Sequence, residues 1–206
     1  MQVKIIDVGV GNVGSIYNAL CKDYDVQCVQ DLTEHEQGTL ILPGMGSAKS
    51  FMQAIDGVGL TEKIKAHAGR KRRIIGICLG FQILGQFSAE DGGVSGLELL
   101  PVYTEYIGNR KTNNGWQNFT LNKNSFANDI LKPSRRKKIT GRVYYNHELG
   151  VKLIKNTDKT KIGYIDYVPN LAPGYISAMQ VDNIFGVQFH PEKSQRTGQQ
   201  LLDWIL

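Results

Sequence analysis

The sequence predicts a single α/β domain with a central mixed, mostly parallel sheet and helices on both faces. Apolar, strand-like runs alternate with helix-like segments through the first half of the chain. The length of 206 residues suits one domain of this class, and a hydrophobic content of 41% supplies a core. No linker, repeat or low-complexity tract divides the chain, so we expect residues 1–206 to form one domain.

The first half of the chain is expected to alternate strands and helices. The near-continuous apolar run at 3–8 predicts a buried strand, because parallel strands are covered on both faces. Apolar residues at helical spacing (Ile16, Ala19 and Leu20) predict a helix over 14–23. Further strands are expected at 26–29, 39–42 and 74–78, and further helices at 47–55, at 60–68 and from 81 to 87.

From about residue 97 the pattern changes to short strands separated by turn residues, which indicates a more antiparallel half. Strands are expected at 102–106, 116–121, 142–145, 162–167, 175–181 and 184–189. A closing helix at 197–206 has Leu201, Leu202 and Ile205 as its apolar stripe.

A cysteine lies between two glycines in Gly76-Ile77-Cys78-Leu79-Gly80, directly after the apolar residues 74–75. This is the G-x-nucleophile-x-G arrangement of a sharp strand-to-helix turn, with a thiol where hydrolases often carry a hydroxyl. Such a turn exposes Sγ at the end of a strand and at a helix N-terminus, where the dipole favours the thiolate. On this motif alone, a buried structural cysteine is an equal alternative.

A second motif, at 186–194, supplies a base. His190 follows a short apolar run, and Glu192 lies two residues later. A thiol nucleophile needs a base within hydrogen-bond reach, and the base needs a carboxylate to set its tautomer. Residues two apart in an extended segment can point the same way. Together the motifs predict a catalytic triad of Cys78, His190 and Glu192.

These motifs, with 5–12, 41–46 and 114–116, resemble those of the class I, triad-type glutamine amidotransferases. The resemblance covers nearly the whole chain and is closest to the glutaminase subunit of imidazole glycerol phosphate synthase, of histidine biosynthesis. It implies a flavodoxin-like fold and hydrolysis of L-glutamine to glutamate and ammonia through a cysteine thioester, with no cofactor and no metal. It also implies a synthase partner, a cyclase of (β/α)8-barrel type that receives the ammonia.

The resemblance implies further roles around the triad. The backbone N–H of Leu79, directly after the nucleophile, is one expected oxyanion donor. The loop of Gly44, Met45 and Gly46 is expected to supply a second, because glycines let a peptide plane turn inward. The positions expected to bind glutamine are Gln82, Glu90, Glu148 and Leu149. The positions that match the partner interface are Asn12, Trp116, Tyr144 and Lys193.

Two segments depart from the family pattern. Residues 113–117 read Asn-Asn-Gly-Trp-Gln in place of His-Met-Gly-Trp-Asn, and residues 147–149 read His-Glu-Leu in place of His-Ser/Thr-Tyr. A carboxylate at Glu148 would repel the substrate carboxylate unless it points away. The alternatives are a paralogue that feeds ammonia to a sugar amidotransferase in surface-polysaccharide biosynthesis, a stand-alone thiol hydrolase, and an inactive regulatory binding protein of the same fold.

Two glycine-containing segments resemble nucleotide-binding loops. Residues 9–14 form a literal G-x-G-x-x-G between a strand and a helix, which is typical of dinucleotide sites. No clear acid ends the following strand, so we favour a turn at the carboxyl edge of the sheet. Pro43 and Ala48 stand at both glycine positions of a P-loop spacing, which excludes that motif.

Charge and cysteine content bear on partners and location. The net charge is +5, with basic clusters at 70–73 and 135–138. Without a nucleic-acid-binding motif, these clusters are expected to be solvated loops or a partner surface. The three cysteines form no C-x-x-C pair and suit a reducing compartment. There is neither a membrane-length apolar stretch nor a signal-like N-terminus, so a cytoplasmic protein is expected.

Overall fold

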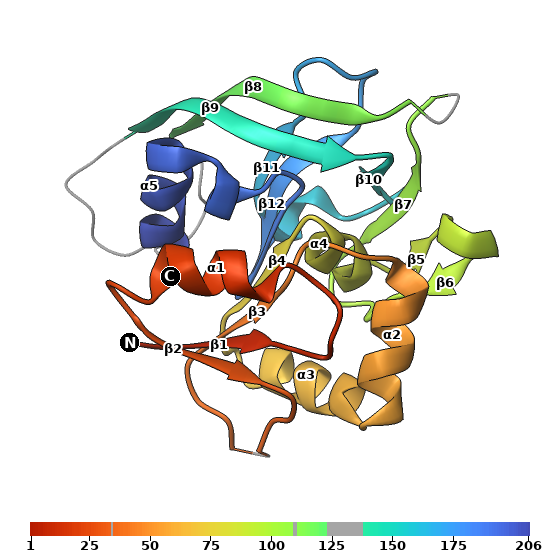
Figure 1. Cartoon of the computed structure of the whole chain (residues 1–206). Coiled ribbons are helices and arrows are strands. Elements are labelled where there is room, and N and C mark those ends of the chain that lie inside the picture. Colours follow the sequence, from red (N-terminus) through yellow and green to blue (C-terminus); the bar gives the residue numbers. More distant parts are fainter. Residues whose placement is uncertain (34, 109–110, 123–137) are drawn as a thin grey trace.

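The computed structural model describes residues 1–33, 35–108, 111–122 and 138–206. Most of the basic cluster at 135–138 therefore lies outside the described residues. A seven-stranded sheet forms the centre of the molecule, in the order β11-β12-β13-β4-β3-β1-β2 (Figure 1). Its parallel strands are β1 (Gln2–Ile6), β2 (Asp25–Val29), β3 (Thr39–Leu42), β4 (Ile74–Ile77) and β13 (Ile184–Val187). Two antiparallel strands, β12 (Ile176–Val181) and β11 (Ile162–Tyr167), extend one edge. The predicted mixed, mostly parallel sheet is confirmed.

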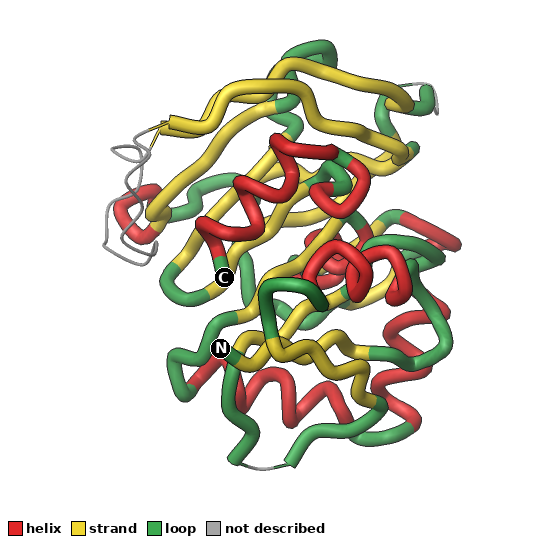
Figure 2. The backbone as a smooth tube through the Cα atoms, turned by 60° about the vertical axis from the view of Figure 1, so that its left-hand side comes forward, coloured by secondary structure: helices red, strands yellow, loops and turns green. Residues whose placement is uncertain are grey.

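Helices cover both faces of this sheet, because successive strand side chains point to opposite sides. Val3 and Ile5 of β1 belong to a core that includes α1 (Val13–Leu20) and α5 (Gln195–Ile205). Ile6 belongs to a second core with α2 (Ala48–Gly57), α3 (Leu60–Gly69) and α4 (Leu79–Leu84). Figure 2 shows helices on two sides of the strands.

The antiparallel half forms two smaller sheets in addition to the edge of the central one. β8 (Asn113–Asn122) pairs with β9 (Lys138–His147) in a two-stranded ribbon that passes over α5 (Figure 1). The four-stranded sheet has the order β10 (Leu149–Leu153), β7 (Val102–Tyr106), β5 (Phe87–Ser88) and β6 (Val94–Ser95). The short strands expected at 116–121 and 142–145 underestimate the ribbon, and β10 was not expected, because pairing across strands decides their extent.

Several helix boundaries also differ from expectation. The helix predicted to continue to residue 87 ends at Leu84, because Gly85 is extended (φ −73°, ψ −175°). Short 3₁₀ helices span Glu90–Gly92, Lys159–Lys161 and Pro191–Lys193. No helix in the described part of the chain has both the length and the apolar character needed to cross a bilayer.

Gly80 allows α4 to pack closely on β3. A Cβ added at Gly80 would lie 2.1 Å from the backbone oxygen of Leu42. We therefore expect Gly80→Ala to lower the free energy of unfolding by about 3 kcal/mol or more, measured by urea denaturation. Gly69→Ala is the matched control, because its Cβ would meet no atom within 4 Å. Equal stability of the two variants would contradict this packing argument.

Candidate active site

Cys78 occupies the sharp turn between β4 and α4. Its backbone has φ 47° and ψ −101°, a conformation that L-residues rarely adopt and that is found at strained functional turns. The Cys78 N–H donates to the carbonyl of Val187 at 2.7 Å. Both flanking glycines are required, since a Cβ at Gly76 would lie 2.7 Å from the carbonyl of Gly80. The predicted sharp turn between β4 and α4 is thus present, and a hydrogen bond ties it to the end of β13.

The sheet topology brings His190 to the same edge. β4 and β13 are parallel neighbours, with Gly76 opposite Gly186, so the segments that follow them emerge together. His190 Nδ1 donates to Glu192 Oε1 at 2.7 Å, and both side chains are fully buried. The backbone of His190 is held by its N–H, which donates to the Tyr144 carbonyl at 2.8 Å. The imidazole is therefore oriented by a carboxylate and positioned by β9.

The environment of His190 favours its charged form. Burial lowers its pKa, but the neighbouring Cys78 and Glu192 outweigh burial and raise that pKa to about 10. The other ring nitrogen of His190, Nε2, has no hydrogen-bond partner among the described residues. Cys78 raises the pKa of His190 because its sulfur lies close to the ring. An imidazolium beside sulfur favours the thiolate that nucleophilic attack requires.

The loop predicted to form the oxyanion hole has its Gly44 carbonyl directed at the Leu79 N–H. The Leu79 N–H, one predicted donor, donates to the carbonyl of Gly44 at 3.4 Å. The Gly44 carbonyl therefore lies where a substrate oxyanion would accept this hydrogen bond. The Met45 N–H belongs to the same planar peptide and points the opposite way. Rotation of this peptide plane would replace the carbonyl with the second donor that the sequence predicts.

A cavity of about 250 Å³ lies beside Cys78. It is lined by all the residues predicted for the oxyanion hole and for glutamine: Gly44, Met45, Gly46, Leu79, Gln82, Glu90, Glu148 and Leu149. Gln82 Nε2 donates to the Leu149 carbonyl at 3.0 Å, while Glu148 is exposed. Glu90 accepts a hydrogen bond from the Ala48 N–H, and burial raises its pKa.

Sequence reasoning missed several residues of this site. Gln188 is buried and its Nε2 donates to Cys78 Sγ at 3.5 Å. Thr112 and Asn146 also line the cavity, next to His147 of the segment 147–149 that the resemblance had already singled out. Gln188 was detectable in principle, because it lies two residues before His190 in the same extended segment.

His147 holds one wall of the cavity as a neutral imidazole. Its Nδ1 donates to the Leu149 carbonyl at 2.7 Å, and its Nε2 accepts from Asn113 Nδ2 at 2.9 Å. Burial, with a smaller contribution from the charge of His190, lowers the pKa of His147 from 6.5 to about 4. A neutral His147 keeps the shared carbonyl in place for Gln82.

This shifted pKa predicts how stability depends on pH. Below pH 6.5 the unfolded chain binds a proton at His147 that the folded protein does not, so the contribution is intact above pH 6.5 and lost as pH falls to about 4. The loss amounts to about 3 kcal/mol. We expect His147→Gln to flatten the fall of unfolding free energy in that window, whereas His35→Gln, at an exposed position, should not. An unchanged slope would contradict the assignment.

The residues expected at the partner interface lie near the triad. The rings of Trp116 and Tyr144 are 5.8 Å apart, and Trp116 is exposed. Lys193 directly follows Glu192. Asn12 contacts Glu192 itself, with its Nδ2 donating to Oε1.

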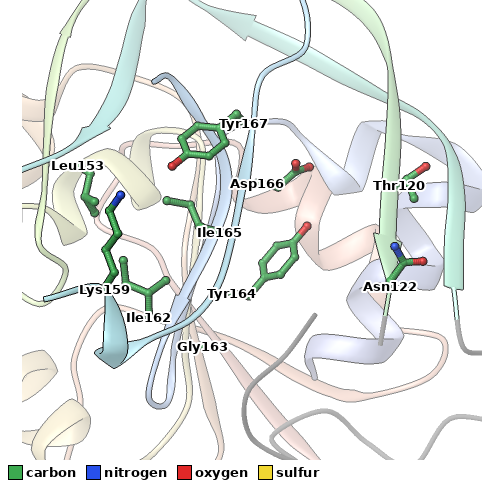
Figure 3. A pocket seen from close by; sticks show the side chains of 10 residues that line it. All are labelled: Thr120, Asn122, Leu153, Lys159, Ile162, Gly163, Tyr164, Ile165, Asp166 and Tyr167. Carbon is green, nitrogen blue, oxygen red and sulfur yellow. The ribbon is translucent and has the colours of Figure 1, made fainter. Parts of the chain in front are cut away.

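A second, larger cavity of about 400 Å³ lies between β8 and β11 (Figure 3). Figure 3 shows its lining side chains, including Lys159, Tyr164 and Asp166. This lining contains no cysteine or histidine, whereas Cys78 lines the smaller cavity.

Comparison with known proteins agrees with this geometry. Residues 4–205 match the family Glutamine amidotransferase class-I. The chain is 32% identical over 217 residues to "Imidazole glycerol phosphate synthase subunit HisH 2" of Vibrio vulnificus, covering 100% of this chain and 95% of that protein. It is also 32% identical to "Imidazole glycerol phosphate synthase hisHF, chloroplastic" of Arabidopsis thaliana, covering 97% of this chain but 33% of that protein.

Solved structures show the same fold at low sequence identity. A structure described as "Crystal structure of glutamine amidotransferase" superposes with a TM-score of 0.71 at 13% identity, covering 98% of this chain and 96% of that one. The family match spans almost all of the chain, and the nucleophile turn, base and carboxylate come together at one sheet edge. The chain belongs to the class-I glutamine amidotransferase family.

Proposed function

We propose that this protein is the glutaminase subunit of an imidazole glycerol phosphate synthase, acting in histidine biosynthesis. The observation that carries the proposal is the buried His190–Glu192 pair beside Cys78, which itself lines a cavity with the predicted glutamine-binding residues. The relatives named for that synthase are matched along nearly the full chain. We place the protein in the cytoplasm, with residues 1–206 as its glutaminase domain.

The chemistry is acyl transfer through sulfur. The Cys78 thiolate attacks the side-chain amide carbon of glutamine, and the Leu79 N–H donates to the resulting oxyanion. The His190 imidazolium gives its proton to the departing ammonia, which leaves a thioester. The neutral imidazole then takes a proton from water, whose hydroxide attacks the thioester and releases glutamate. Glu192 keeps His190 in the required tautomer throughout.

We further propose that the partner is a cyclase of (β/α)8-barrel type, bound near Trp116, Tyr144 and Lys193 to form a heterodimer. The ammonia would pass to it directly. The Leu79 N–H donates to the Gly44 carbonyl and so is not available to an oxyanion. This contact supports the idea that the isolated subunit is at rest and becomes active when the partner turns the Gly44–Met45 peptide. The Arabidopsis relative, of which this chain covers 33%, is long enough to hold a second catalytic unit.

The test is glutamine hydrolysis with and without a purified cyclase subunit of that synthase. We expect the two proteins to co-purify and the cyclase's nucleotide substrate to stimulate glutamate release at least tenfold. Hydrolysis that ignores this cyclase but responds to a sugar amidotransferase would favour the polysaccharide paralogue. This alternative is worth testing because Glu148, in the cavity wall, stands where the family pattern has serine or threonine.

Glu148 is expected to weaken glutamine binding. Its exposed carboxylate lines the cavity, where it repels the substrate carboxylate through solvent. We expect Glu148→Gln to lower the KM for glutamine about threefold, since an exposed charge pair is worth under about 1 kcal/mol, with kcat unchanged. Added salt should lower the KM of the wild type more than that of the variant. An unchanged KM in both tests would show that the carboxylate points away from the substrate.

A further inference from the structure

Asn12 connects the two halves of the candidate site. Its Nδ2 donates to Glu192 Oε1 at 2.5 Å, and its Oδ1 accepts from the Gly44 N–H at 3.1 Å. Glu192 Oε1 is also the oxygen that accepts from His190 Nδ1. A continuous hydrogen-bonded chain therefore runs from the oxyanion loop through Asn12 and Glu192 to the imidazole.

The local backbone directs Asn12 toward this position. Asn12 is the N-cap of α1, and its carbonyl accepts from the Ser15 and Ile16 N–H groups. An asparagine at an N-cap ordinarily uses its side chain to cap the helix, but here the side chain makes no capping bond. Gly11 has φ +120°, and a Cβ there would lie 2.7 Å from Pro43 Cγ. The glycine-rich turn at 9–14 thus packs on the oxyanion loop and presents Asn12 to it.

Glu192 depends on this contact. Its second oxygen, Oε2, is buried and has no hydrogen-bond partner among the described residues. The carboxylate is therefore held by Asn12 on one side and His190 on the other. The Glu192 carboxylate needs a hydrogen-bond donor and the Gly44 N–H needs an acceptor, and the primary amide of Asn12 supplies both.

Asn12 also restricts which part of the oxyanion loop can rotate. The Gly44 N–H belongs to the Pro43–Gly44 peptide, whereas the carbonyl that accepts from Leu79 belongs to the next peptide. Asn12 holds the first peptide in place, so that only the Gly44–Met45 peptide plane is free to rotate. The Asn12 side chain therefore contacts both the loop that would move and the carboxylate of Glu192.

We propose that Asn12 is a positioning residue that orients Glu192 and anchors the oxyanion loop to the triad. This inference rests on the proposed function for its kinetic effect, because Asn12 is argued to act through Glu192 and Gly44 and not on glutamine directly. It adds a role within the subunit to the interface position that the family resemblance implies.

The test compares Asn12→Ala, Asn12→Asp and the control Asn18→Ala, an exposed position on the same helix. Asn12→Ala should lower kcat ten- to a hundredfold with KM within threefold, because misplacing a catalytic group costs about that much. Asn12→Asp keeps the acceptor for Gly44 and loses the donor to Glu192 when ionised. Two adjacent carboxylates share a proton at lower pH, so protonated Asp restores the donor. The ratio of kcat for Asp to kcat for Ala should therefore rise at least threefold between pH 8 and pH 6.

A second readout does not depend on glutamine or on a partner. The rate at which iodoacetamide alkylates Cys78 should show the same pH-dependent ratio. It is measured on the peptide that contains Cys78, because Cys21 and Cys28 are exposed thiols that react as well. A wild type that fails to hydrolyse glutamine even with the cyclase and its nucleotide substrate present would overturn the proposed function and leave this readout able to judge Asn12. The inference would be overturned if Asn12→Ala and Asn12→Asp both had alkylation rates and kcat values within threefold of those of Asn18→Ala at every pH. Thermal melting checks that each variant is folded.

Discussion

Cys78→Ala is expected to abolish glutamine hydrolysis, with kcat lowered about ten-thousand-fold or more. Removing Sγ removes the atom that forms the thioester, and no other cysteine is near: Cys21 and Cys28 are exposed, whereas Cys78 is buried in the turn after β4. The variant should fold, because the Cys78 N–H still donates to Val187 and alanine has the same backbone requirements. The measurement is glutamate release in the presence of the partner, with circular dichroism and partner binding as checks on the fold.

Cys28→Ala is the matched control for this substitution. Cys28 is an exposed thiol on β2, at the far edge of the sheet from β11. We expect its variant to retain full activity. Turnover near the wild-type level in Cys78→Ala would show that another group performs the attack, and the triad assignment would fall.

Glu192→Gln should lower kcat about a thousandfold or more while preserving the shape of the site. The amide is similar in size to the carboxylate but carries no charge, so it no longer stabilises the imidazolium of His190. Since Glu192 is one of the groups that raise the pKa of His190 to about 10, that pKa should fall in the variant. The pH profile of kcat and an NMR titration of the imidazole measure the two effects.

The same change has a predicted effect on stability. A raised pKa means that protonated His190 contributes stability that is fully present below pH 6.5 and lost as pH rises toward 10. Glu192→Gln should therefore flatten the fall of unfolding free energy across that window. Glu62→Gln, at an exposed position on α3, is the control for loss of a carboxylate. An unaltered His190 titration would show that Glu192 does not orient the base.

Local sequence was sufficient for the nucleophile turn and for the parallel half of the sheet. The run that becomes β4 is fully buried, as a strand covered on both faces must be, and a Cβ at Gly76 would strike the backbone of Gly80 in the following turn of helix. A contact between residues this close in the chain leaves a pattern in the amino-acid order, whereas the packing of Gly80 on Leu42 of β3 depends on the fold.

The extent of the ribbon and the end of α4 were not predictable in this way. β9 extends from Lys138 to His147 because it pairs along its whole length with β8, from which its residues are separated by 16 (Asn122 and Lys138) to 34 positions (Asn113 and His147). Gly85 ends α4 where a Cβ would lie 2.7 Å from the carbonyl of Val102, on another strand. Periodicity within a segment carries no information about such distant neighbours.

The sequence by itself determined the residue types from which the proposed chemistry is built: a thiol in a glycine-flanked turn, and a histidine with a carboxylate two residues later. Only the tertiary structure decided how these groups work together. The parallel pairing of β4 with β13 places Cys78 and His190 at one sheet edge, and the packing of Gly11 on Pro43 brings Asn12 between Glu192 and Gly44. The direction of the Gly44 carbonyl in the predicted oxyanion loop is likewise a tertiary property, because it depends on the Leu79 N–H that it meets. Residue types set which reactions are available, whereas distances between segments far apart in the chain set which groups act together and in which state.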